Sequence, residues 1–208
     1  MSSISIIGLG GMARALAERA LASGHDVEVI GRDPAKTEEL AAALGSRATA
    51  GSFGASPAGD IVILAVTHAG GVPVVRQYGD ALAGKVVVDI SNTFVGADDT
   101  RLVTPEGTSG GQQIAAALPA SAYVVKAFNT VFGHVLARGG PLDVLFAGDD
   151  AGAKASVSAF IESLGLCPLD VGGLEMARWL EGVGPLLMGL ARNGAGTFDV
   201  ALSVDFPG

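Results

Sequence analysis

A glycine-rich turn stands near the start of the chain, between a short apolar run and a helical pattern. It reads Ile7-Gly8-Leu9-Gly10-Gly11-Met12-Ala13, which is the spacing G-x-G-x-x-A. In this spacing the first glycine makes a tight turn, the second lets backbone approach a pyrophosphate, and the small sixth residue lets helix pack on strand. The N–H groups at the start of the helix attract an anion. The predicted dinucleotide-binding residues here are Gly8, Leu9, Gly10, Gly11 and Met12, and the alternative is a glycine turn that binds no nucleotide.

The tip of the next predicted strand indicates which dinucleotide is bound. It reads Gly31-Arg32-Asp33-Pro34-Ala35-Lys36. An NAD site needs an acid at this tip for the ribose 2′-hydroxyl, whereas an NADP site needs an arginine for the 2′-phosphate. Asp33 precedes a proline and is better suited to cap the following helix. Lys36 lies in the first helical turn, where a cation opposes the helix dipole unless a phosphate is near. We therefore predict NADP(H), bound by Gly31, Arg32 and Lys36; the alternative is that the two cations are solvated surface charges.

Polar residues follow three further apolar runs, where predicted strands end. In open α/β sheets, ligands bind outside the carboxyl ends of the strands, so these three tips are expected to meet at one crevice. The tips read Ala65-Val66-Thr67-His68, Asp89-Ile90-Ser91-Asn92-Thr93 and Lys126-Ala127-Phe128-Asn129-Thr130. The residues predicted to contact the cofactor there are Ala65, Val66, Thr67, His68, Asn92, Ala127 and Asn129.

Two of these residues are candidates for a chemical role, although neither pattern identifies a definite catalytic group. His68 is the histidine best placed to contact a nicotinamide or a substrate, and a structural role is the alternative. Lys126 is a candidate acid for the reduction of a carbonyl or an imine, because a desolvated lysine can be tuned towards neutral pH. The alternative, which we prefer, is a lysine that forms hydrogen bonds inside the crevice.

Short apolar runs alternate with helical patterns along the chain. This alternation predicts a Rossmann-type α/β fold, a doubly wound and mostly parallel sheet with a small C-terminal helical extension. Residues 1–138 are expected to form the NADP-binding domain, and residues 139–208 to complete the sheet and form a wall of the acceptor site or a dimer contact. Gly182, Gly184 and Pro185 predict a kink or a break in the last helix, 174–192. Strands are predicted at 4–7, 27–30, 47–50, 61–66, 86–90, 123–128, 144–146, 166–171 and 198–204.

Composition excludes several classes of protein. The 208 residues carry a formal net charge of -8, which argues against binding nucleic acid or an anionic membrane through the overall field. The apolar runs fall short of the roughly 18–20 residues that a membrane helix needs, and the first residues do not read as a signal peptide. The single cysteine, Cys167, excludes an internal disulfide, and no His/Cys/Asp/Glu cluster predicts a metal site. We expect a cytoplasmic homodimer.

These motifs together resemble the NADP oxidoreductases that depend on coenzyme F420. They are also similar to the reductase domain of the six-transmembrane metalloreductases. The resemblance spans nearly the whole chain, and no six-helix membrane part is present. Matching segments are Ile6-Ile7-Gly8-Leu9-Gly10-Gly11-Met12-Ala13, Val88-Asp89-Ile90-Ser91-Asn92, Val124-Val125-Lys126-Ala127-Phe128-Asn129-Thr130-Val131, Ala147-Gly148-Asp149-Asp150 and Leu169-Asp170-Val171-Gly172-Gly173-Leu174, together with residues 31–36, 177–178 and 185–187.

The resemblance implies hydride transfer between NADPH and coenzyme F420, a deazaflavin, by proximity and orientation rather than by an obligatory acid or base. By matching position, residues 9–12 would hold the pyrophosphate, and residues 67–68 and 129 would lie near the nicotinamide. The helix from Leu174 would wall the pocket of the small-molecule hydride acceptor. The archaeal members have a His-Thr pair where this chain has Asn129-Thr130. A reductase of a flavin, a metal chelate or a carbonyl, and a non-enzymatic NADP(H) sensor, remain as alternatives.

Overall fold

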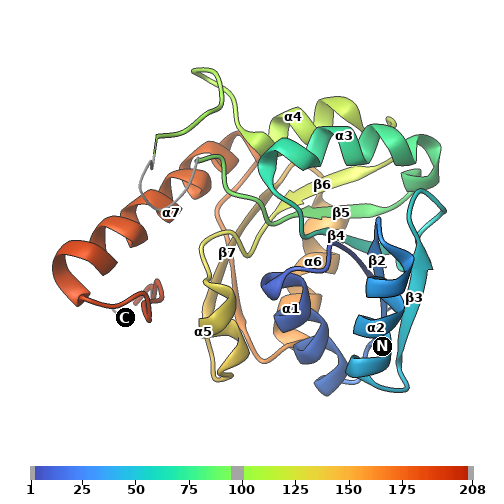
Figure 1. Ribbon diagram of the computed structural model, residues 1–208. Coiled ribbons are helices and arrows are strands. Elements are labelled where there is room, and N and C mark those ends of the chain that lie inside the picture. Colours follow the sequence, from blue (N-terminus) through green and yellow to red (C-terminus); the bar gives the residue numbers. More distant parts are fainter. Residues whose placement is uncertain (1–2, 95–100, 206–208) are drawn as a thin grey trace.

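A computed structural model describes residues 3–94 and 101–205 of the chain. Within those residues the strands form one eight-stranded sheet in the order β3-β2-β1-β4-β5-β6-β7-β8 (Figure 1). The reversal of strand order at β1 and β4 is the switch point at which Rossmann folds bind dinucleotides. The strands are β1 Ser3–Ile7, β2 Asp26–Gly31, β3 Ala48–Ser52, β4 Ile61–Leu64, β5 Val86–Asp89, β6 Tyr123–Lys126, β7 Asp143–Gly148 and β8 Cys167–Asp170.

Helices cover both faces of this sheet, with α3 and α4 on one face and α1 and α6 on the other (Figure 1). None of the helices in the described parts of the chain is long and apolar enough to cross a membrane. The helices are α1 Gly11–Ala22, α2 Pro34–Leu44, α3 His68–Tyr78, α4 Gly110–Ala117, α5 Gly133–Ala137, α6 Ala151–Ser163 and α7 Ala177–Leu190, with short helical segments at Gly79–Leu82, Leu174–Met176 and Ala191–Ala195.

The strands read as continuous apolar runs because both of their faces are buried. In β4, Ile61 and Ile63 pack into the core beneath α1 and α6. The alternate residues Val62 and Leu64 pack into the core beneath α3 and α4. All four side chains are at most 4% exposed. The two cores hold the carboxyl ends of β1, β2, β4, β5 and β6 at one edge, and this edge carries the candidate site.

The predicted α/β sheet is confirmed, and most of its strands are parallel. β7 runs antiparallel to β6, with Val125 opposite Gly148, and β8 is parallel to β7. The sequence pattern does not distinguish these directions, because buried strands of either direction read as short apolar runs. β7 and β8 extend the sheet beyond β6, while the division into two domains at residue 138 stays a prediction.

Two features of the C-terminal part differ from expectation. The expected strand at 198–204 is wrong, because this segment has no strand pairing and forms an irregular tail. Helix α7 is continuous from Ala177 to Leu190 and contains Pro185, so the expected break is wrong. Gly184 has a packing role there, since a Cβ atom on it would lie 2.7 Å from a ring carbon of Phe94. The glycine that suggested a break instead allows α7 to lie against the loop after β5.

Candidate functional site

The glycine turn after β1 is fixed by close backbone approach. The Gly8 N–H donates to the carbonyl of Ile30 at 2.9 Å. A Cβ atom on Gly8 would lie 2.1 Å from the carbonyl oxygen of Ala65, and its φ of +133° suits glycine alone. The turn therefore joins the tips of β1, β2 and β4 at the switch point of the sheet.

The next two glycines leave an open surface at the start of α1. Gly10 caps the helix in an extended conformation without a side-chain hydrogen bond, and the first turn contains no acidic residue. A Cβ atom added to Gly10 or to Gly11 would meet nothing within 4 Å. The backbone N–H groups of this turn therefore face space that an anion can enter, and the helix dipole favours a negative charge there. This arrangement fits the pyrophosphate of a dinucleotide.

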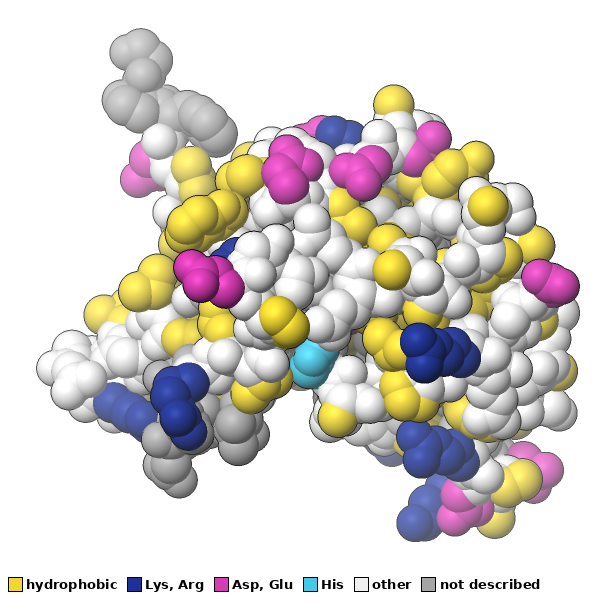
Figure 2. Space-filling model, turned by 90° about the horizontal axis from the view of Figure 1, so that it is seen from above, with side chains coloured by type: hydrophobic (Ala, Val, Ile, Leu, Met, Phe, Trp, Pro, Cys, Tyr) yellow, Lys and Arg dark blue, Asp and Glu magenta, His cyan; other side chains and the backbone are white. Residues whose placement is uncertain are grey.

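A pocket of about 240 Å³ continues from this turn along the tip of β2. A second pocket of about 360 Å³ adjoins it and shares Gly31, Arg32 and Phe53 with it. The guanidinium carbon of Arg32 lies 5.9 Å from the centre of the Phe53 ring, within the range of a cation–π contact. Figure 2 shows one group of Lys and Arg side chains at the right of the view, which is the side of α2 and β3 in Figure 1, and a second group at the lower left. A positive group thus stands where a 2′-phosphate would be recognised.

Asp33 caps α2, as the sequence predicts. Its Oδ1 accepts from the N–H groups of Ala35 at 3.1 Å and Lys36 at 3.3 Å. The ammonium group of Lys36 lies 3.7 Å from Asp33 Oδ2, and the side chain is 73% exposed. Lys36 does not line either of the two pockets beside Arg32. Its role towards the phosphate therefore stays a prediction.

The tip of β4 leads directly into α3. Thr67 caps this helix without a side-chain hydrogen bond, and His68 is its first residue. A Cβ atom on Gly110 would lie 2.9 Å from Nδ1 of His68 and 2.8 Å from Cγ2 of Thr93. The imidazole is therefore half-buried between the starts of α3 and α4, next to the tip of β5. This position is compatible with a contact to a ligand at the crevice.

The tips of β5 and β6 are joined by paired amides. Asn92 Nδ2 donates to the backbone carbonyl of Asn129 at 3.0 Å, and Asn129 Nδ2 donates to Asn92 Oδ1 at 3.0 Å. A pocket of about 130 Å³ lies between these residues and α7. Its lining is mostly apolar and consists of Asn92, Phe94, Asn129, Thr130, Val131, Phe132, Gly184, Leu187 and Met188.

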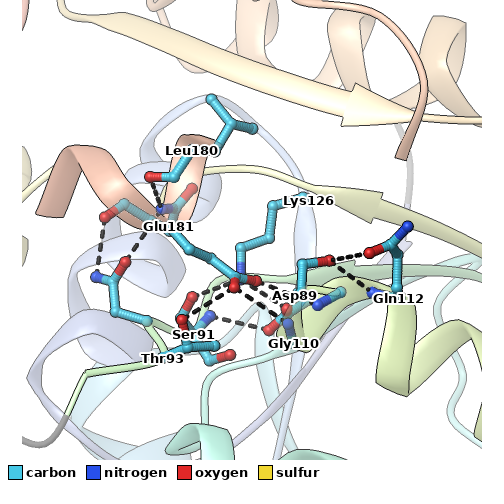
Figure 3. Close-up of polar contacts among 12 residues, drawn as sticks. Asp89, Ser91, Thr93, Gly110, Gln112, Lys126, Leu180 and Glu181 are labelled. Carbon is cyan, nitrogen blue, oxygen red and sulfur yellow. Dashed lines mark hydrogen bonds and ion pairs between the residues drawn. The ribbon is translucent and has the colours of Figure 1, made fainter. Parts of the chain in front are cut away.

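A buried ionic cluster lies behind this pocket and joins the sheet to α7 (Figure 3). Lys126 Nζ lies 2.7 Å from Asp89 Oδ2 and 3.0 Å from Glu181 Oε1, and donates to the carbonyl of Ser91 at 2.5 Å. The three charged side chains are at most 1% exposed. The three N–H donors of the ammonium group are matched by three oxygen partners, and Lys126 does not line the pocket beside Asn129. This geometry supports the hydrogen-bonded alternative for Lys126.

Sequence reasoning missed Glu181, which completes the cluster. Its carboxylate accepts from the N–H groups of Gly110 at 3.1 Å and Gly111 at 3.2 Å, and from Thr93 Oγ1 at 2.9 Å. It therefore supplies the negative charge that the start of α4 favours. The sequence did offer a signal for this residue, namely a glutamate within the apolar sequence of α7. A charged side chain in a buried helix requires partners.

The remaining predicted residues lie at the same edge. Ala65 is in contact distance of Gly8, as described above, and Val66 lines the pocket next to Arg32. Ala127 directly follows β6, and its side chain is fully buried in the core beneath α1 and α6. Gly133, at the start of α5, would bring a Cβ atom within 3.4 Å of Cα of Met12. The predicted residues thus surround one continuous edge, and α5 is an addition that the sequence did not indicate.

Known proteins resemble this chain in sequence. Residues 3–93 match the family model described as NADP oxidoreductase coenzyme F420-dependent. The F420-dependent NADP reductase of Methanocaldococcus jannaschii is 34% identical over 143 residues, which are 65% of this chain and 64% of that protein. Metalloreductase STEAP3 of Rattus norvegicus is 34% identical over 184 residues, 86% of this chain and 36% of that protein. The chain thus spans about a third of one curated relative and less than two thirds of the other.

A solved structure has a similar fold over nearly the full length of this chain. It is a protein of Arthrobacter sp. FB24 named as a candidate F420-dependent NADP reductase. The two structures superimpose with a TM-score of 0.86 at 27% sequence identity, covering 99% of this chain and 100% of the other. The family model matches the glycine turn and the tips of β2, β4 and β5, and the structural match includes α7. The chain therefore resembles the coenzyme F420-dependent NADP oxidoreductases in sequence over residues 3–93 and a candidate F420-dependent NADP reductase in fold over its full length.

Proposed function

We propose that this protein is an oxidoreductase that transfers a hydride between NADPH and coenzyme F420. The observation that carries the proposal is the row of complementary surfaces along one edge of the sheet. It begins with the guanidinium group of Arg32 after β2, passes the open backbone at Gly10 and Gly11 after β1, and reaches the apolar pocket against α7. These surfaces match, in order, a phosphorylated ribose, a pyrophosphate and planar rings.

The chain's own residues contribute binding and orientation. The first turn of α1 binds the pyrophosphate through N–H groups, and Arg32 binds the 2′-phosphate through charge-assisted hydrogen bonds. Phe132, Leu187 and Met188 exclude water from the pocket beside Asn129. NADPH, when bound, supplies a hydride from its nicotinamide ring. Transfer between stacked rings requires proximity and alignment, which such a site provides without a proton donor.

The acceptor is the less constrained part of this proposal. The relatives include a metalloreductase as well as an F420-dependent reductase. Reduction of a flavin, a metal chelate or a carbonyl in place of coenzyme F420 is therefore tested in the same experiment. NADP(H) binding without turnover of any acceptor would leave the sensor alternative.

We also propose that the protein works as a homodimer. Helix α7 exposes three large apolar side chains, with Trp179 69%, Leu186 73% and Leu190 51% exposed. Their spacing of seven and four residues places them on one face of the helix. A second copy of the chain is the partner that we propose for this face. The single cysteine accords with the reducing cytoplasm that the sequence predicts.

The decisive experiment mixes the purified protein with NADPH and oxidised coenzyme F420 and follows the absorbance of the deazaflavin. FMN, a ferric chelate and a simple ketone run as parallel acceptors, and NADH replaces NADPH as the cofactor control. We expect fast bleaching with coenzyme F420 and NADPH, and slow reaction in the other mixtures. Fast turnover of another acceptor, with none of coenzyme F420, would contradict the proposed acceptor.

A further inference from the structure

Two buried polar atoms in the pocket beside α7 have no hydrogen-bond partner. They are Oδ1 of Asn129 and Oγ1 of Thr130. The residues are only 5% and 2% exposed, and both line the pocket of about 130 Å³. Buried polar atoms are almost always paired, because an unpaired one loses its hydration without compensation. Two neighbouring unpaired atoms in one pocket therefore indicate that a ligand supplies the missing partners.

The orientation of the Asn129 amide follows from its neighbours. Its Nδ2 donates to the backbone carbonyl of Leu180 at 2.8 Å, and a carbonyl can accept but cannot donate. The Asn92 amide is fixed in the same way, because its Nδ2 donates to the backbone carbonyl of Asn129 at 3.0 Å. Neither amide can be flipped without placing two oxygens against each other. The unpaired atom of Asn129 is therefore an acceptor.

Backbone strain accompanies this pair. Phe128 directly precedes Asn129 and has a φ of +60°, and it is the one non-glycine residue with positive φ in the part of the chain that the structure describes. The turn is closed by a hydrogen bond from the N–H of Val131 to the carbonyl of Phe128 at 3.1 Å. A bulky residue in this conformation is unfavourable, and such strain is concentrated at functional sites. The strained turn places Asn129 and Thr130 in the pocket wall.

We infer that Asn129 and Thr130 form a binding site for an amide group. Asn129 Oδ1 accepts from the N–H of that amide, and Thr130 Oγ1 donates to its carbonyl oxygen. The inference rests on the proposed function and deepens it, because two partners of the proposed reaction carry such a group. One is the carboxamide of the nicotinamide, and the other is the ring imide of the acceptor. The apolar residues around the pair exclude water, which strengthens both hydrogen bonds.

The test uses Thr130→Val, which removes the hydroxyl group and keeps the shape of the side chain. Dissociation constants are measured by titration for NADP⁺, for its 3-acetylpyridine analogue, in which a methyl group replaces the amide nitrogen, and for coenzyme F420. Thr130→Ser retains the hydroxyl group and is expected to bind as the wild type does. Thr104→Val is the matched control, since Thr104 Oγ1 is also buried and unpartnered but does not line this pocket.

We expect Thr130→Val to raise the dissociation constant of one amide-bearing ligand about tenfold, the effect of one lost hydrogen bond of about 1.4 kcal/mol. Its melting temperature should be equal to or higher than that of the wild type, because the unpaired hydroxyl group is gone. A purely structural role would lower it. Thr104→Val should leave all three dissociation constants unchanged.

The arms of the test separate the two sources of the amide. The analogue lacks the N–H that Asn129 Oδ1 accepts but keeps the carbonyl oxygen to which Thr130 Oγ1 donates. Weaker binding of the analogue than of NADP⁺ to the wild type, together with a similar further loss of affinity for both in Thr130→Val, assigns the carboxamide. If Thr130→Val loses affinity for coenzyme F420 while its NADP⁺ binding is unchanged, the bound group is the ring imide of the acceptor. Unchanged dissociation constants for all ligands would overturn the inference, even if the wild type turns over coenzyme F420. Conversely, a specific loss for NADP⁺ would support it even if another acceptor were reduced.

Discussion

The ammonium group of Lys126 lies 3.0 Å from the carboxylate of Glu181, with both side chains fully buried. Lys126 belongs to β6 and Glu181 to α7, so the contact joins the sheet to the C-terminal helix (Figure 3). The same helix supplies Gly184, Leu187 and Met188 to the pocket beside Asn129. The ion pair therefore determines where one wall of the candidate acceptor pocket stands.

Replacing Lys126 with methionine is expected to lower the free energy of unfolding by about 3–5 kcal/mol. The substitution leaves the carboxylates of Asp89 and Glu181 buried without a cation, and an uncompensated buried charge is strongly unfavourable. Urea denaturation followed by circular dichroism measures the change. The control is Lys154→Met, since Lys154 forms a more exposed pair with Asp170 at 2.9 Å and its loss should cost about 0–1 kcal/mol. Equal effects of the two substitutions on the free energy of unfolding would contradict the role of the ionic cluster in holding α7 against the sheet.

Replacing Arg32 with alanine should weaken NADPH binding much more than NADH binding. A hydrogen bond to a charged group contributes about 1.5–3 kcal/mol, so the expected rise in the dissociation constant for NADPH is about 10- to 150-fold. Fluorescence titration with both cofactors measures the difference. Arg47→Ala serves as the control, because Arg47 precedes β3 and donates to the carbonyl of Leu21, at the edge of the sheet opposite the site. Equal weakening for both cofactors would exclude recognition of the 2′-phosphate by Arg32.

Gly8 and Gly10 should respond differently to replacement by alanine. At Gly8 the new Cβ atom would lie 2.1 Å from the Ala65 carbonyl oxygen at a φ of +133°, so we expect the free energy of unfolding to fall by more than about 3 kcal/mol. At Gly10 there is room for Cβ, and the stability should change by about 1 kcal/mol or less. NADP⁺ binding to Gly10→Ala should nevertheless weaken about tenfold, because Cβ occupies the space of the pyrophosphate.

Thermal unfolding and NADP⁺ titration of the two glycine variants separate these roles. Tight NADP⁺ binding by Gly10→Ala would show that the open turn does not hold the pyrophosphate. A Gly8→Ala variant as stable as the wild type would show that the turn can move away from Ala65.

The C-terminal tail is expected to respond to acid through Asp199. Hydrogen bonding from Arg138, whose Nη2 lies 2.8 Å away, and the nearby His134 hold the pKa of Asp199 below its ordinary value of 3.8. A lowered pKa means that the docked tail favours the ionised carboxylate. Docking is therefore strengthened at a pH above 3.8 and is lost as the pH falls through the lowered pKa.

Amide hydrogen exchange of residues 197–204, measured by mass spectrometry, tests this dependence. Asp199→Asn should show fast exchange in the tail already at neutral pH, because the amide cannot form the ionic contacts. Asp205→Asn changes an exposed acid of the same tail and should exchange as the wild type does. Slow exchange in Asp199→Asn would show that other contacts, such as that between the rings of Phe132 and Phe198, hold the tail.

Local patterns were enough to predict much of the fold. The run Ile61-Val62-Ile63-Leu64 indicated a strand buried on both faces, and the structure places its residues alternately in two cores. Asp33 before a proline indicated a helix cap, and its carboxylate accepts from two N–H groups of the helix. The terminal strand was wrong, because apolar residues near a chain end show no pairing partner. Proline and glycine in α7 suggested a kink or a break. The break is wrong, because α7 is continuous through Pro185, and the kink stays a prediction.

The sequence by itself determined the glycine turn, the positive tip of β2 and the edge of the sheet at which both lie, because each depends on neighbouring residues and a periodic pattern. Only the tertiary structure decided that Glu181 pairs with Lys126 and that Asn129 and Thr130 retain unpaired atoms in a pocket. These relationships join segments far apart in the chain. Their energies depend on burial and distance, which no local pattern contains.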